Sequence, residues 1–441
     1  MVAVVAAMSA ALIVPALASA QGRVRLVKDI HPGGEGCTFV CPGSAPRNLT
    51  SFRGKLFFSA ADGVHGNELW KSDGTRAGTK LVKDIYPGVE DSLPTWEPSG
   101  GKARGIGRTL FFKARDGRHG WGLWKSDGTR AGTKLVRAFG DSDPSWLTKG
   151  PGGRLFFFAD DELWTSDGTR SGTKLVKKMT YGPFIDDEAT RVGRLLFFTA
   201  RQGEHLWRSD GTREGTRRIK RVRNPRGLTN VDGTLFFKAI DRHRAHGREL
   251  WRSNGTGAGT KLVKDIVPGT EGGNIGRLHG FFGKLFFTAD DGVHGEELWK
   301  SNGTSAGTRL FKEIEPGSAG SSPRALKRVG RKFVFSVSGG VPDRCQLWKS
   351  DGTRSGTKLV RGDAGCPTPA WIWGTTTVAG TLVFPATDGG VWRTDGTRSG
   401  TRRVVENVDV EDPRSFTGAG GILFFAGGYS FPGDELWKVV F

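Results

Sequence analysis

The sequence predicts an all-β protein, a single β-propeller whose blades are four-stranded antiparallel sheets. A segment of the form ELWKSDGTRAGTKLVKDI, at residues 68–85, recurs at nearly regular intervals through the 441 residues. The chain contains 68 Gly, 28 Phe and 14 Trp, and its apolar runs are separated by Gly, Asp and Ser. This composition is typical of many short strands joined by tight turns. The third observation is that both chain ends carry incomplete copies of the repeat.

Tryptophan marks the register of the repeat nine times. These positions span 367 residues in eight intervals, about 46 residues each, and such a period with strand content indicates a propeller or a solenoid. Within the first full unit, strands are expected at residues 48–52, 55–60, 68–72 and 79–85. Short connections make these four strands an antiparallel meander. The nine tryptophans are Trp70, Trp124, Trp164, Trp207, Trp251, Trp299, Trp348, Trp392 and Trp437.

The two chain ends distinguish a closed ring from an open stack. Residues 24–30 (VRLVKDI) form a fourth strand without its first three, whereas residues 422–441 end without a fourth strand. Because these fragments complete each other, we expect the N-terminal strand 24–30 to join the C-terminal strands 422–441 and close the ring. A solenoid would instead need polar capping units. The count is nine blades, or eight if one unit is degenerate.

The first twenty residues are uncharged and apolar and end in Ala18-Ser19-Ala20. This pattern predicts a signal peptide at 1–20, followed by a propeller domain at 21–441. A retained membrane anchor is the alternative, although Pro15 and the small-residue end argue against it. No Lys or Arg lies near Met1, as a signal peptide usually has, which leaves the assignment of the start methionine open. We expect a secreted, extracellular or cell-surface protein, with the periplasm as a second location, and no membrane span in the mature chain.

The four cysteines fit an exported protein. Cys37 and Cys41 lie close together, and Cys345 and Cys366 bracket one copy of the repeat, so two local disulfides are the natural pairing. A zinc site from the same thiolates lacks the usual CxxC spacing.

The repeated SDGT segment is expected to form the hairpin between the third and fourth strands. Asp-Gly supplies a positive-φ turn, and neighbouring Ser and Thr side chains can bond the backbone. A calcium loop is the alternative, but each turn carries one acidic residue and two carry Asn instead. No metal site and no cofactor is predicted. The structural turn residues are Asp73, Asp127, Asp167, Asp210, Asn254, Asn302, Asp351 and Asp395.

The units ELWKSDGTRAGTKLVKDIYPG, ELWRSNGTGAGTKLVKDIVPG and ELWKSNGTSAGTRLFKEIEPG resemble the bacterial ELWxxDGT repeat family, over nearly all of the mature chain. The hairpin is also similar to the Asp-box of sialidase-type propellers. The resemblance implies a secreted or surface protein with a propeller-like fold, and it supplies no catalytic residues to transfer. Four units depart from Glu-Leu-Trp and carry Gly122, His205, Gln346 or Gly390-Val391 before or within the motif.

Loop parity predicts which face of the ring would bind a ligand. The uniform SDGT hairpins lie on one face, and the variable segments, such as residues 86–101, lie on the other. Aligned on a proline, three blades have Pro-x-Trp and four others have Pro-Arg near the central opening. Indole and guanidinium groups there would suit sugar rings and anions; the alternative is that the tryptophans plug the channel. The candidate ligand-binding residues are Trp96, Trp146, Trp371, Trp373, Arg47, Arg226, Arg324 and Arg414.

The formal net charge is +20, and much of it falls on repeated positions beside the Trp and on the outer strands. A solvated perimeter that discourages edge-to-edge association, and hence a monomer, is one interpretation. Attraction to an anionic polysaccharide or a surface protein is the other. No nucleic-acid recognition motif is present.

No motif nominates catalytic residues. The sequence therefore favours a non-catalytic binding or scaffold module, and the alternative is a propeller glycoside hydrolase or lyase acting on an extracellular glycan.

Overall fold

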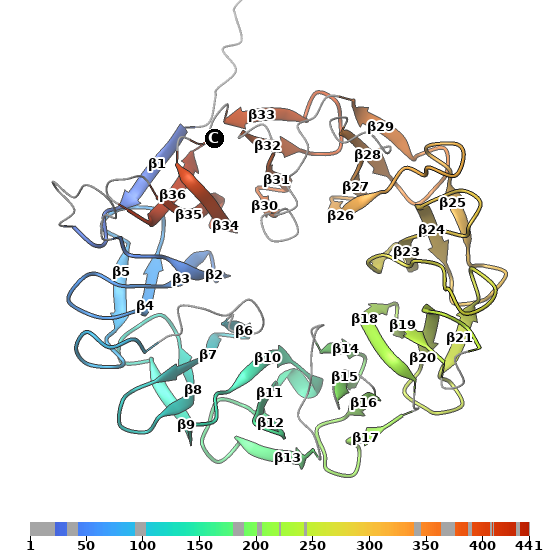
Figure 1. Ribbon diagram of the computed structural model, residues 1–441. Helices are drawn as coiled ribbons and strands as arrows, with labels where there is room; N and C mark the ends of the chain where they lie inside the picture. Colours follow the sequence, from blue (N-terminus) through green and yellow to red (C-terminus); the bar gives the residue numbers. More distant parts are fainter. Residues whose placement is uncertain are drawn as a thin grey trace, which may run out of the picture.

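In the computed structural model, the chain forms a closed ring of nine four-stranded sheets around a central opening (Figure 1). The structure describes residues 23–32, 43–92, 103–179, 189–200, 205–219, 222–241, 245–338, 345–362, 375–386, 390–405, 408, 410–428 and 433–440. Successive strands of each sheet pair antiparallel, with the earliest strand innermost in blades 1 to 8. The nine-bladed propeller is confirmed, and the count of eight is excluded. None of the described segments forms a helix long and apolar enough to cross a membrane.

The strands follow the chain blade by blade. Blades 1 to 3 contain β2 (Arg47–Phe52), β3 (Lys55–Ala60), β4 (Glu68–Ser72), β5 (Lys80–Lys83); β6 (Arg104–Ile106), β7 (Thr109–Arg115), β8 (Trp121–Ser126), β9 (Lys134–Gly140); and β10 (Ser145–Lys149), the short 3-10 turn η1 (Pro151–Gly153), β11 (Leu155–Ala159), β12 (Glu162–Ser166), β13 (Lys174–Lys178). Blades 4 to 6 contain β14 (Thr190–Val192), β15 (Leu195–Ala200), β16 (His205–Ser209), β17 (Arg217–Arg218); β18 (Arg223–Val231), β19 (Thr234–Ile240), β20 (Glu249–Ser253), β21 (Lys261–Lys264); and β22 (His279–Phe281), β23 (Lys284–Ala289), β24 (Glu297–Ser301), β25 (Arg309–Lys312). Blades 7 to 9 contain β26 (Arg324–Val329), β27 (Lys332–Val337), β28 (Gln346–Ser350), β29 (Lys358–Arg361); β30 (Thr376–Val378), β31 (Thr381–Pro385), β32 (Val391–Thr394), β33 (Arg402–Val405); and β34 (Glu411–Ala419), β35 (Ile422–Gly428), β36 (Glu435–Val440), β1 (Arg23–Lys28).

The ninth blade closes the ring with strands from both ends of the chain. β1 pairs antiparallel with β36, and Leu26 lies opposite Trp437. Sheet order β1-β36-β35-β34 therefore places the N-terminal strand in the outermost position (Figure 1). This is the closure that the two incomplete repeats predicted, and it leaves no blade with a missing strand.

The hydrophobic core lies between blades. Among the described residues it divides into nine clusters, one at each blade interface. Successive residues of a strand face opposite sides, so Leu69 packs toward blade 2 and Trp70 packs toward blade 9. Burying both sides of every sheet explains why the second and third strands are nearly continuous apolar runs.

The SDGT hairpins have one geometry throughout the ring. In blade 1, Asp73 Oδ1 accepts bonds from the Thr75 amide at 3.0 Å and from the Thr75 hydroxyl at 2.7 Å. Gly74 has a φ of +89°, which favours glycine. A Cβ on Gly78 would lie 1.9 Å from Asp73 Oδ1, so a side chain does not fit there. The conserved spacing of the motif within this chain thus follows from the turn itself.

Two sets of cations latch neighbouring blades at several interfaces. In blades 1, 2 and 9, the lysine after the repeat Trp reaches the following blade's turn, as when Lys71 Nζ donates to Gly128 O at 2.6 Å. A cation on the outer strand forms the second latch: Lys83 Nζ donates to Thr133 O at 3.0 Å and lies 5.5 Å from the centre of the Trp124 ring. The repeated positive charge therefore has a structural use at the perimeter.

Candidate functional site

The variable loops between blades are held by the glutamate of the ELW motif. The Glu68 carboxylate is fully buried and accepts bonds from the amides of Ile85 and Tyr86, at 2.9 and 3.0 Å, and from the Ser92 hydroxyl at 2.7 Å. These bonds draw the backbone away from the sheet, so β5 ends at Lys83, before the predicted strand end at residue 85. Burial raises the pKa of Glu68 to about 7, against the effect of the three hydrogen bonds. Equivalent buried glutamates are Glu249, Glu297 and Glu435.

Sequence reasoning missed this role of the glutamate. The available signal was its recurrence at the first position of the motif, where a charged residue would otherwise face a buried strand. Its partners lie about 20 residues later in a loop of changing length, so spacing alone does not reveal them.

The four predicted arginines occupy one equivalent position at the start of the innermost strands. Arg47, Arg226, Arg324 and Arg414 pair across their sheets with Ser59, Lys238, Ser336 and Ala426, which share one register. The structure therefore brings them to one level of the ring.

Their surroundings differ from blade to blade. Arg324 is exposed and pairs with Glu296 at 2.5 Å, and Arg414 pairs with Asp434. Arg226 is half-buried and donates from Nε to Asn224 Oδ1 at 3.0 Å. Two of the four guanidinium groups are thus already neutralised by carboxylates.

Trp146 lies one residue beyond the arginine position. Ser145 pairs with Phe158, and Arg47 pairs with Ser59. Because Phe158 and Ser59 occupy the same position in their second strands, Ser145 is the residue equivalent to Arg47. Trp146 has a φ of +56°, is half-buried and packs against the core between blades 3 and 4. Trp146 therefore has at least a structural role.

Trp96, Trp371 and Trp373 lie outside the described residues, as do Cys37, Cys41, Cys366 and segment 1–20. Cys345 is disulfide-bonded.

A second set of equivalent positions lies three residues further along each innermost strand. All nine are half-buried, and six are threonine. The Thr190 hydroxyl donates to Leu228 O in the next blade at 2.7 Å, and Arg104 Nε makes the same kind of bond to Leu147 O at 3.1 Å. The usual task of this position is therefore to join neighbouring innermost strands. The nine residues are Thr50, Arg104, Thr148, Thr190, Thr229, His279, Lys327, Thr376 and Thr417.

Blades 6 and 7 depart from this pattern with His279 and Lys327. Exposed Arg277 lies two residues before His279. Burial lowers the pKa of His279 to about 4, and the positive charges of Lys327 and Arg277 add to that effect. The pKa of Lys327 is also lowered, by burial and then by Arg277. The structure shows no carboxylate paired with any of the three within its described segments.

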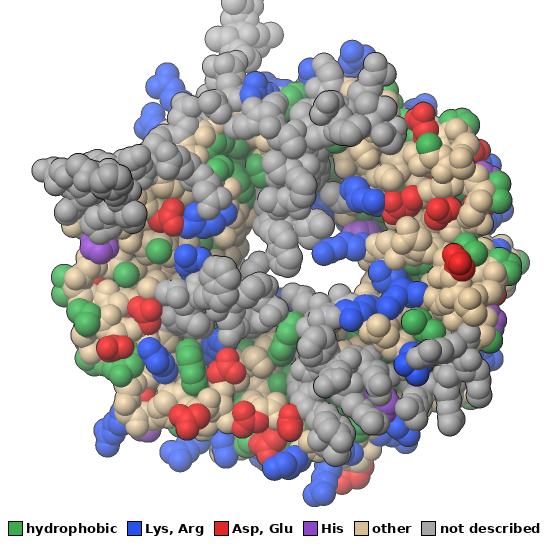
Figure 2. Space-filling model, in the orientation of Figure 1, with side chains coloured by type: hydrophobic (Ala, Val, Ile, Leu, Met, Phe, Trp, Pro, Cys, Tyr) green, Lys and Arg blue, Asp and Glu red, His purple; other side chains and the backbone are tan. Residues whose placement is uncertain are grey.

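Together with Arg226 of blade 5, these residues form what we call the cationic arc: Arg226, Arg277, His279 and Lys327. Figure 2 shows Lys and Arg side chains gathered along the central opening on the side where β18, β23 and β26 lie in Figure 1. Sequence reasoning missed Arg277, His279 and Lys327 because the innermost strands share little beyond an alternating pattern. Only the strand pairing shows that His279 and Lys327 replace threonine.

Comparisons with known proteins identify no family for the chain. No protein-family model matches it, and no curated protein matches it. Among solved structures, the computationally designed Ika8 protein has a TM-score of 0.43 and 13% identity, covering 86% of this chain and 98% of its own. A prolyl endopeptidase structure has a TM-score of 0.42 and 12% identity, and the match covers 79% of this chain and 53% of the endopeptidase chain. An oligogalacturonate lyase from Vibrio parahaemolyticus has a TM-score of 0.41 and 10% identity, and the match covers 76% of this chain and 86% of the lyase chain. Likeness at these scores carries no argument about activity.

Proposed function

We propose that this protein is an exported, non-catalytic binding propeller that holds an anionic polysaccharide at its central opening through the cationic arc. The observation that carries the proposal is the placement of Lys327 and Arg277 around half-buried His279, without a paired carboxylate in the segments that the structure describes.

The arc opposes stability, which is the reason to assign it a ligand. Six other blades place threonine at this level, where a hydroxyl joins adjacent strands without charge repulsion. Burial and the nearby charge of Arg277 both destabilise the charged form of half-buried Lys327. An anionic ligand would reverse that cost, and the low-dielectric walls of the opening would strengthen the attraction.

A polysaccharide is favoured among anions because the other features suit an exported protein that binds sugars. The apolar N-terminal segment and the resemblance to secreted repeat proteins support export, and with it the pairing of Cys37 with Cys41 and of Cys345 with Cys366. Arginines at one level, such as Arg226, can bind carboxylate or sulfate groups through two parallel bonds.

A lyase acting on the same polymer is the second candidate, because His279 is neutral at pH 7 beside two cations. A neutral imidazole can accept the proton next to a sugar carboxylate, whose charge the cations would neutralise. The electrons of the broken C–H bond would form a C=C bond as the bond to the glycosidic oxygen breaks, and that oxygen would take a proton from water.

Binding of the mature chain to acidic and neutral polysaccharides at two salt concentrations tests the proposal. We expect selective binding of acidic polymers that weakens with salt, and a loss of about tenfold, about 1.4 kcal/mol, in Lys327→Thr. Arg328→Thr is the matched control, because it removes a cation from the same strand as Lys327. The Arg328 side chain lies outside the cationic arc and donates to Gly330 O. Equal loss in both variants would contradict the assignment. Release of unsaturated sugar that His279→Thr abolishes would establish the lyase.

A further inference from the structure

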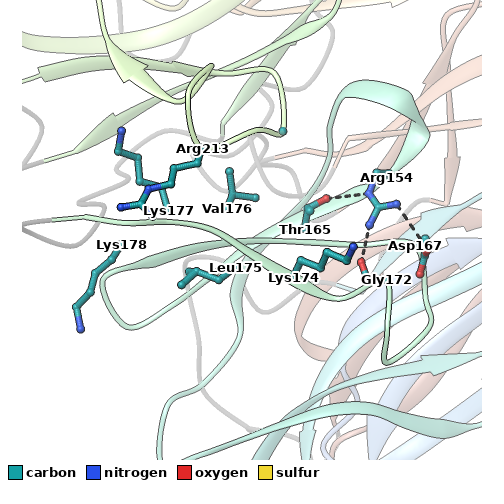
Figure 3. Close-up of a pocket in the computed structure, with 11 residues that line it drawn as sticks. Arg154, Thr165, Asp167, Gly172, Lys174, Leu175, Val176, Lys177, Lys178 and Arg213 are labelled. Carbon is teal, nitrogen blue, oxygen red and sulfur yellow. Dashed lines mark hydrogen bonds and ion pairs between the residues drawn. The ribbon is translucent and has the colours of Figure 1, made fainter.

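A pocket of about 550 Å³ lies between the outer parts of blades 3 and 4, away from the innermost strands that line the central opening. Figure 3 shows the residues that line it. It is lined by β12 and β13 of blade 3 and by the turn after β16 of blade 4. Its volume is in the range of small-molecule sites, about 300–1,000 Å³. Leu175, which is 46% exposed, and Val176 supply an apolar wall.

At this pocket, blade 3 lacks the long basic side chain that follows the repeat Trp elsewhere. The residue after the repeat Trp is Lys or Arg in eight blades, and in blade 3 it is Thr165. At the preceding interface, Lys125 Nζ spans the gap and donates to Gly168 O at 2.7 Å. The Thr165 side chain is too short to reach Gly211, which holds the same turn position in blade 4.

The nearby arginine does not replace the missing latch. Arg154 Nε donates to Thr165 Oγ1 at 3.2 Å, and its Nη2 donates to Gly172 O at 2.5 Å, both within blade 3. Figure 3 shows this guanidinium turned toward Thr165, Gly172 and Asp167. The space toward Gly211 therefore stays open.

The charge lining the pocket is strongly positive: five Lys or Arg side chains and one carboxylate, Asp167. Lys177 is engaged, since it donates to Thr216 O at 2.7 Å and lies over the Trp207 ring. Lys174 and Arg213 are exposed and have no ion pair with any carboxylate that the structure describes. Figure 3 shows these two cations at opposite ends of the pocket, with the apolar wall between them, an arrangement that suits a small ligand with oxyanion groups.

We propose that this pocket binds a small organic molecule or side chain bearing carboxylate, sulfate or phosphate groups, which Lys174 and Arg213 contact from opposite ends of the pocket while its apolar part lies against Leu175. The site is independent of the cationic arc, because the arc lies on the innermost strands of blades 5 to 7 and the pocket lies on the outer strands of blades 3 and 4.

Calorimetric titration of the mature chain with citrate, inorganic phosphate and a hexaglutamate peptide tests the proposal. Binding of citrate or phosphate without the peptide assigns a small-molecule site, and preference for the peptide assigns an acidic side chain of a partner. The proposal is overturned if none of the three binds.

Two variants locate the binding. Thr165→Lys copies the latch of blades 1, 2 and 9, so it should fill the pocket and weaken binding at least tenfold while the melting temperature stays the same or rises. Lys174→Ser with Arg213→Ser should weaken binding at least fivefold. The matched control is Lys134→Ser with Arg170→Ser, which removes the equivalent charges at the latched interface of blades 2 and 3 and should leave binding unchanged.

Unchanged binding in Thr165→Lys and in the Lys174, Arg213 double variant would overturn the assignment, as would equal weakening in the control. The Lys327→Thr variant distinguishes the pocket from the cationic arc. It should weaken polysaccharide binding at the central opening and leave citrate binding at the pocket unchanged, so the two proposals can fail independently.

Discussion

Replacement of Lys327 by threonine should raise the pKa of His279 in the innermost strand of blade 6. Burial is the largest cause that lowers the pKa of His279 from 6.5 to about 4, and the charges of Lys327 and Arg277 come next. The whole difference corresponds to about 3 kcal/mol. Burial is the largest cause, and Lys327 and Arg277 share the remainder, so Lys327 accounts for less than half of the lowering. We therefore expect the pKa of His279 to rise by about 0.5 to 1 in Lys327→Thr.

The assay is a pH titration of the His279 ring by NMR, with the signal assigned by its loss in His279→Thr. Six blades already carry threonine at this level, so the Lys327→Thr variant should fold. It should also be somewhat more stable to urea at pH 7, because a repulsive charge is removed. An unchanged His279 pKa in Lys327→Thr, or the same rise in Arg328→Thr, would refute the electrostatic account of the arc.

The same histidine affects stability in a defined pH window. Its folded pKa lies below its unfolded value, so the fold favours the neutral ring. That stabilisation is complete above about pH 6.5 and is lost as the pH falls toward 4. In His279→Thr, this part of the acid sensitivity should disappear.

Four further predictions concern the repeat. Glu68→Leu should lower the free energy of unfolding by about 2–4 kcal/mol in urea denaturation, because it leaves the buried amides of Ile85 and Tyr86 without acceptors; exposed Glu90→Leu is the control. Because the folded pKa of Glu68 is raised to about 7, the stability that it contributes is present below about pH 4.5 and is lost as the pH rises to 7, and Glu68→Gln should remove this trend. Lys125→Met should cost about 0.5–1.5 kcal/mol through its bond to Gly168, unlike exposed Lys134→Met. Gly132→Ala should lower stability by at least about 2 kcal/mol, because its Cβ would lie 2.1 Å from Asp127 Oδ1, whereas Gly362→Ala, with open space around it, should not.

The fold was predictable because local chemistry and global closure agree in this sequence. The Asp73-Gly74 turn fixes one hairpin per unit, and the strand alternation of Leu69 and Trp70 places a side chain in each neighbouring interface. Complementary ends at Leu26 and Trp437 then require a ring. Each of these features is carried by residues that are adjacent in the chain or identical between units.

The candidate sites were less predictable because they depend on register between strands and between blades. The proline alignment places Ser145 at the position of Arg47, as the sheet pairing does, but it does not show that Trp146 packs against the core between blades 3 and 4. His279 and Lys327 become comparable only when each is matched to its partner in the second strand. By contrast, Thr165 could have been found from sequence, since it interrupts a run of Lys and Arg at a repeated position.

The location of function in this ring follows from how the repeat holds it together. Equivalent bonds recur between several pairs of neighbouring blades, so a unit that lacks one of them lacks stability that those blades have. Thr165 abandons a latch and opens a pocket, whereas Lys327 replaces a threonine and places a cation beside another half-buried group. The eight blades with Lys or Arg after the repeat Trp are the reference for Thr165, and the six blades with threonine at the level of Lys327 are the reference for Lys327. If restoring the repeat residue raises stability and removes binding at each place, then those departures exist for ligands; if restoration changes neither, then the ring tolerates them as neutral variation.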